Sequence, residues 1–171
     1  AEAVLDRLLD GRLREYVRLG LYPGPLGSAE VFLNPEKKPQ GAMVIGLGRV
    51  GELTLGHLTI GFARGALVYA TRLAEQEKRA HQGRFPQPVQ AKISTLLIGT
   101  GAGGMTIEDS MAALLHGVAQ ANRTLAEHST NTVAITELEF IELFEDRAIA
   151  AAHALPRLIQ NPLLHGEFED K

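Results

Sequence analysis

The sequence contains no cysteine. This absence excludes disulfide bonds, thiolate zinc sites and cysteine nucleophiles, and it is compatible with a reducing cytoplasm, where we expect the protein to be located. The sequence also lacks an apolar run approaching the roughly 20 residues that span a membrane, so we expect no membrane partner. Its net charge of -3 shows no basic excess, which argues against binding to nucleic acid.

Several motifs of catalysis and cofactor binding are also absent. The six histidines show neither H-x-x-x-H nor H-E-x-x-H spacing, which are typical of metal sites on helices. The chain has no G-x-x-x-x-G-K-[ST] phosphate loop and no G-x-S-x-G nucleophile motif. We therefore expect no metal and no cofactor, and we favour the interpretation that this domain is not an enzyme.

Two glycine-rich segments are the most informative feature that is present. The first, GLGRVG, spans residues 46–51, and the second, GTGAGG, spans residues 99–104. Each follows an apolar segment and precedes a helical pattern. Glycine permits positive φ and a close approach to the backbone, and free N–H groups at the start of a helix can bind an anion. The segments are therefore either phosphate-binding loops or tight turns.

Hydrophobic periodicity predicts alternating helices and strands. The expected helices span residues 1–19, 54–79, 106–127 and 145–155, and the expected strands span residues 28–33, 42–47, 92–98 and 133–144. This order predicts a single α/β domain over residues 1–171, with three layers and a mostly parallel or mixed sheet flanked by helices. We divide it into an N-terminal helical segment (1–27), a core (28–155) and a tail (156–171), and we expect it to be part of a longer protein.

The continuous apolar run at residues 42–47 predicts a strand that is buried on both faces, as in a parallel sheet. Right-handed crossovers would place both glycine segments at the carboxyl ends of their strands. If those strands are neighbours, the two segments face one crevice, which is where open α/β sheets bind ligands.

The candidate ligand-binding residues lie in these two segments. They are Gly46, Gly48, Arg49, Gly99, Thr100, Gly101, Ala102, Gly103 and Gly104. No acid follows at the distance that a dinucleotide site requires, so nicotinamide binding is not expected. Glu108 and Asp109 at the start of the next helix would repel a phosphate, which favours the alternative of a tight turn followed by a capped helix.

The segment 137–147 is unusually acidic for a strand. In a hydrolase, Glu142 or Asp146 would be the candidate general base or ribose acceptor. The alternative, which we favour, is an edge strand protected by its charge, with the acids at 145 and 146 stabilising the start of the last helix.

Both glycine segments carry a resemblance to known families. Residues 93–105, with the sequence ISTLLIGTGAGGM, resemble the diphosphate-binding loop of macro domains. Residues 44–54, VIGLGRVGELT, are similar to the N-terminal, non-catalytic domain of leucine aminopeptidases, which has a macro-like fold. The resemblance implies a macro-like fold. The chain lacks the Asn-containing first loop of ADP-ribose-hydrolysing macro domains and the metal-binding half of the aminopeptidases.

More weakly, the chain resembles a region that accompanies caspase-like CHAT peptidase domains in large bacterial proteins. This resemblance implies a recognition or regulatory domain whose partners are other domains of the same protein or a separate protein. The alternative is a domain that binds ADP-ribose or a related nucleotide at the glycine segments, and a hydrolase is the third hypothesis.

Overall fold

The computed structural model describes residues 2–34, 36, 38–81, 89–101, 104–128, 133–164 and 166–168. These residues form the helices α1 (Glu2–Leu8), α2 (Arg12–Arg18), α3 (Leu55–Ala80), α4 (Ile107–His128) and α5 (Glu145–Ile159), and the strands β1 (Ala29–Leu33), β2 (Gly41–Ile45), β3 (Val89–Leu96) and β4 (Val133–Ile141). Helices and strands alternate through the core, so the expected α/β class is confirmed. The three-layer arrangement stays a prediction.

The strands form two separate pairs rather than one sheet. Strand β2 pairs with β1 antiparallel, and β3 pairs with β4 parallel. The expectation that residues 42–47 lie in a parallel sheet is therefore wrong. The apolar run has another cause, because helices cover both faces of β2. Met43 and Ile45 pack toward the α3–α4 core, whereas Ala42 and Val44 pack toward α1 and α2.

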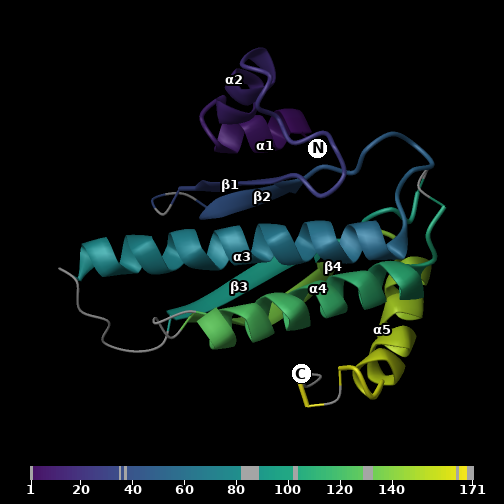
Figure 1. Cartoon of the computed structure of the whole chain (residues 1–171). Helices are drawn as coiled ribbons and strands as arrows, with labels where there is room; N and C mark the ends of the chain where they lie inside the picture. Colours follow the sequence, from purple (N-terminus) through teal and green to yellow (C-terminus); the bar gives the residue numbers. More distant parts are fainter. Residues whose placement is uncertain are drawn as a thin grey trace.

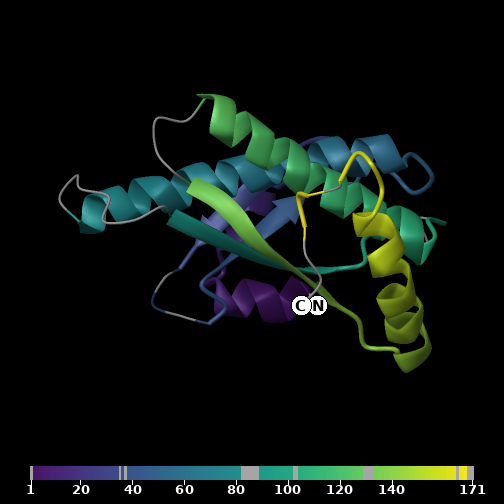
Figure 2. The same cartoon turned by 90° about the horizontal axis from the view of Figure 1, so that it is seen from below.

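Helix α3 contacts both pairs of strands and runs alongside α4 (Figures 1 and 2). It begins after Thr54, whose hydroxyl oxygen accepts a hydrogen bond from the amide of His57 at 3.2 Å and so caps the helix. The small residues Gly61 and Gly65 let β2 come close, because a Cβ at Gly65 would lie 2.5 Å from Sδ of Met43. Thr106 likewise accepts a bond from the amide of Asp109 at the start of α4.

The expected helical segment at residues 1–19 is divided into α1 and α2 at Gly11, a residue type that can kink or divide a helix. Asp10 and Gly11 both have left-handed backbones with φ of 59° and 79°. One helical end differs from the expected one. Helix α5 continues past Pro156 to Ile159, since burial of Leu158 against α4 favours a further turn. Figure 1 shows α1 and α2 on the side of β1–β2 that faces away from α3.

The main core lies where α3 and α4 cover one face of β3–β4. Phe62, Leu114 and Ile93 are among its buried residues. Strand β3 buries Ala91 and Thr95 on this face. Lys92 and the other residues that alternate with the buried ones are exposed on the opposite face. Among the described residues, no helix has the length and apolar character needed to cross a membrane.

Candidate functional site

The amide groups of the first glycine segment are bonded within the chain. The amide of Gly46 donates to the carbonyl of Ser28 at 2.8 Å, and the amide of Gly48 donates to the carbonyl of Gly24 at 2.9 Å. The amide of Arg49 donates to a carboxylate oxygen of Glu52 at 2.9 Å. A Cβ at Gly46 would lie 2.1 Å from the carbonyl oxygen of Pro25, so glycine is needed here for packing. These three amides of the segment therefore already have acceptors, all in residues outside the segment.

The described residues of the second glycine segment, Gly99, Thr100, Gly101 and Gly104, lie in the connection between β3 and α4. Gly99 and Gly104 have φ of 82° and 71°, values that favour glycine. The amide of Gly104 donates to the carbonyl of Gly101 at 3.2 Å, and the amide of Met105 donates to the carbonyl of Gly99 at 3.0 Å. The candidate residues Ala102 and Gly103 lie outside the described residues. The positive φ angles therefore account for glycine at positions 99 and 104 without any need for a ligand.

A polar cluster connects this turn with the start of α5. The hydroxyl of Thr100 donates to the carbonyl of Leu97 at 2.9 Å and accepts a hydrogen bond from the guanidinium of Arg147. Nε of Arg147 lies 3.0 Å from a carboxylate oxygen of Glu142, without the alignment of a hydrogen bond. The sequence singled out Thr100 and Glu142 separately, and the structure brings them together through Arg147.

Glu142 is held as a carboxylate. The amides of Phe144, chiefly, and of Leu143 donate to its Oε1, and together with the Arg147 guanidinium they lower the pKa of Glu142. A carboxylate with a lowered pKa is a weak base and, near neutral pH, is not a proton donor. Asp146 lies exposed in the first turn of α5, where its negative charge is favourable to the helix dipole, but the start of α5 has no side-chain cap hydrogen bond.

The two glycine segments approach each other only at their ends. A Cβ at Gly99 would lie 3.0 Å from Cδ2 of Leu53, which follows the first segment. Because β2 does not pair with β3 in the described part of the chain, the segments are not at the ends of neighbouring strands. None of the described candidate glycines, nor Arg49 or Thr100, lines either of the two cavities described next.

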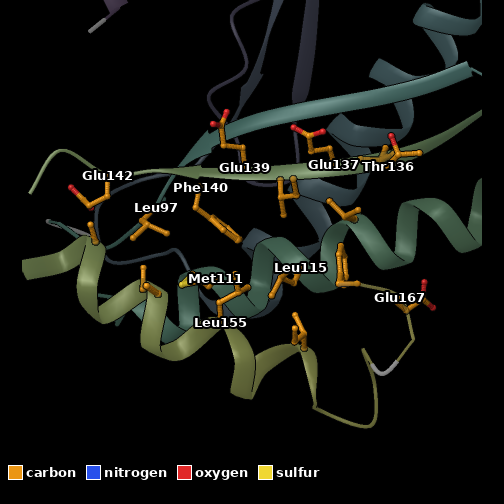
Figure 3. A pocket seen from close by; sticks show the side chains of 18 residues that line it. Leu97, Met111, Leu115, Thr136, Glu137, Glu139, Phe140, Glu142, Leu155 and Glu167 are labelled. Atoms are coloured by element: carbon orange, nitrogen blue, oxygen red, sulfur yellow. The ribbon is translucent and has the colours of Figure 1, made fainter. Parts of the chain in front are cut away.

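The first cavity, of about 800 Å³, lies between β4, α4 and α5 (Figure 3). Its interior is apolar and includes Met111, Leu115 and Phe140. Figure 3 shows Glu137 and Glu139 directed to the opposite side of β4 from Met111 and Leu115. The carboxylates at its border have partners: Glu137 with Lys92, Glu139 with Ser94, Glu142 with Arg147 and Glu167 with Arg123.

The second cavity is a groove of about 840 Å³ between β2 and β3, with α3 along its base. Its walls include Gly41, Met43 and Ile45 from β2, and Gln90, Lys92 and Ser94 from β3. The sequence predicted neither the groove nor its residues. No local pattern could have done so, because the groove exists only through the relative placement of two strand pairs on one helix.

In the described part of the chain, no group of three or more His, Asp or Glu residues could hold a metal ion. The amides of Gly46, Gly48 and Arg49 and the carboxylates at the border of the first cavity have partners within the chain. Comparison with known proteins adds no family, since no protein-family model matches the sequence and no curated protein matches it significantly.

Proposed function

We propose that this chain is a non-catalytic recognition or regulatory domain of a larger bacterial protein, with a macro-like fold. The observation that carries the proposal is the cluster of Thr100, Arg147 and Glu142. A phosphate site or a general base needs polar groups that are free to meet a substrate, whereas these groups are occupied by one another.

The first glycine segment supports the same proposal. Its Arg49 amide, which opens the turn at residues 49–52, already has a carboxylate partner in Glu52. A negatively charged ligand would have to displace that carboxylate and then lie beside it. Like charges at this distance repel, so the segment favours a structural role.

One observation favours nucleotide binding as the alternative. The side chain of Arg147 is 30% exposed, and its buried Nε has no hydrogen-bond partner in the described part of the chain. A phosphate oxygen near Thr100 could bind this guanidinium, provided that Glu142 moved away. Bidentate binding of phosphate by arginine is strong, which makes this the alternative that most needs a test.

Calorimetric titration with ADP-ribose, ADP and inorganic phosphate separates the two functions. The chain should give no binding heat with any of them. The informative variant is Gly101→Glu, because a side chain at Gly101 meets no atom within 4 Å and would place a carboxylate at the second glycine turn. Gly24→Glu is the matched control, since a side chain there also has open space.

Micromolar binding of ADP-ribose that is lost in Gly101→Glu and kept in Gly24→Glu would overturn the recognition proposal in favour of the alternative. The hydrolase hypothesis has its own test, in which release of ADP-ribose from an ADP-ribosylated protein is measured. We expect no turnover. Turnover that Glu142→Gln abolishes would establish that activity.

A further inference from the structure

The side of β2 that faces the groove presents backbone hydrogen-bonding groups. In an antiparallel pair, residues that exchange hydrogen bonds with the partner strand alternate with residues that do not. The amide of Gly46 bonds to Ser28, and the amide of Asn34 bonds to Gln40, which fixes the even-numbered residues of β2 as the bonded set. The N–H and C=O groups of Gly41, Met43 and Ile45 therefore point away from β1.

The opposite wall of the groove has the same character. The N–H and C=O groups of Ile135 in β4 bond to the side chain of Asn122, so they point away from β3. Its register partner Ala91 then bonds to β4, and Lys92, which follows a register shift in the pair, points the other way. The carbonyl of Lys92 confirms this direction, because it accepts a hydrogen bond from the Tyr69 hydroxyl of α3 at 3.1 Å.

Alternation along β3 extends this direction to Gln90 and Ser94, which line the groove with Lys92. Two strand edges therefore face each other across one groove. No hydrogen bond between described residues uses the backbone groups of Gly41, Met43 or Ile45. Unpaired strand edges are where a further strand adds to a sheet.

The residues at the base of the groove determine which side chains a bound strand should have. Phe62, Tyr69 and Leu73 of α3 form an apolar surface there, so alternate side chains of an added strand would be apolar. The lining has one carboxylate and one ammonium group. Glu77 lies 3.5 Å from His81, and Lys92 pairs with Glu137 at 2.8 Å. Since the described lining carries one negative and one positive side chain, a segment without net charge is complementary.

We propose that the groove binds an extended, uncharged segment of a partner polypeptide as an added β-strand. The segment would hydrogen-bond to β2 on one side and β3 on the other, and so would join the two strand pairs into one sheet. The segment would be between five and eight residues long, because β2 has five residues and β3 has eight. This inference rests on the proposed recognition function and names the chemistry of its partner.

The test is selection of random eight-residue peptides, displayed on phage, on the purified chain. Enriched peptides should alternate apolar and polar residues, should lack proline inside the segment and should carry little net charge. N-methylation of a selected peptide at alternate amides should weaken binding about tenfold or more, because each methyl group removes a donor to a strand edge.

The groove variant is Gln90→Pro, which removes an edge N–H that β4 does not use. Leu143→Asp is the control, since Leu143 is exposed and lies outside the groove. We expect peptide binding to fall in Gln90→Pro and to persist in Leu143→Asp. N-methylated peptides test the same donors without any change in the protein, so a folding defect in Gln90→Pro would not obscure the result.

Absence of enriched peptides, or binding that tolerates N-methylation at every position, would overturn the strand-addition proposal. Light scattering tests whether a second copy of the chain occupies the groove. A dimer that dissociates in Gln90→Pro would assign the groove to that second copy and would also overturn the strand-addition proposal. Any of these results would overturn strand addition but would leave the recognition function possible with another kind of partner. Binding of ADP-ribose that Gly101→Glu abolishes would instead overturn the recognition function itself.

Discussion

The outer edges of the two strand pairs differ from the inner edges that face the groove. At the outer edge of β1, Arg72 donates to the carbonyl of Val31 and Arg12 donates to that of Leu33 at 3.3 Å. At the outer edge of β4, Asn122 bonds to both backbone groups of Ile135. The inner edge of β2 has no such side-chain partner among the described residues.

This difference shows that exposure of a strand edge is not uniform in this protein. Side chains occupy outer-edge groups that could otherwise pair with another chain, as natural sheets commonly require. On the inner side, Tyr69 occupies the carbonyl of Lys92 alone. If the inner edges are a binding surface, removing outer-edge partners should cost stability, whereas changes at the inner edges should affect binding more than stability.

The largest effect is expected for Asn122→Leu. This change leaves the N–H and C=O of Ile135, which is 4% exposed, without partners, and should lower the free energy of unfolding by about 2–4 kcal/mol. Chemical denaturation measures this directly. The control is Asn161→Leu, because the Asn161 side chain accepts a bond from the amide of Leu163 at an exposed turn, and its loss should cost far less. Equal losses in both variants would show that the bonds to the strand edge at Ile135 do not cause the large effect.

A smaller loss is expected for Arg72→Met. The guanidinium of Arg72 bonds to Val31 and pairs with Glu30 at 2.6 Å, but its side chain is 42% exposed, so we expect a loss of about 1 kcal/mol. Arg72→Lys keeps the charge without the planar fork and should recover part of this loss. An outer-edge role would be excluded if Arg72→Met unfolded at the same denaturant concentration as the native chain.

Tyr69→Phe should cost about 0.5–1 kcal/mol near neutral pH through loss of the hydrogen bond to Lys92. Burial, as the main cause, raises the pKa of Tyr69. A raised pKa in the folded state means that the contribution is complete below about pH 10 and is lost as the pH rises further. Denaturation at several pH values should show the two proteins converging above pH 10.

The smallest effect is expected for Ser94→Ala on the groove side of β3. Its hydroxyl donates to an exposed carboxylate of Glu139 at 2.5 Å and does not contact an edge group. Stability should therefore change by less than about 0.5 kcal/mol. A loss comparable with that of Asn122→Leu would show that the inner edge is stabilised by its side chains after all.

The sequence predicted the elements of this fold well where the signal was local. Thr54 and Thr106 each cap the helix that was expected after them, and all four expected strands exist. The pairing of the strands was not predicted correctly. An apolar run such as residues 42–47 indicates that both faces of a strand are covered, but it does not indicate which strand pairs with it. The left-handed backbone at Asp10 also carries no strong sequence signal, unlike that of the neighbouring glycine.

The candidate site was predictable only in part. The sequence identified Thr100 and Glu142 as polar groups near strand ends, and these do lie in one cluster. Arg147 joins them. An ion pair between Arg147 and the nearby acids was foreseeable from the sequence, and it forms with Glu142. Its bond to Thr100 was not foreseeable, since Thr100 and Arg147 lie on different elements. The groove depends on an absence of pairing between β2 and β3, which is a property of the assembled chain.

Helix α3 has a consequence beyond its place in the core. It is a single helix of 26 residues that contacts both strand pairs, with glycines at its contact with β2. A helix resists bending far more than a loop does, so the width of the groove is set before any peptide arrives. A ligand would meet a preorganised receptor and would lose mainly its own conformational freedom on binding. Rigid or cyclised extended peptides should therefore bind more tightly than flexible ones of the same sequence.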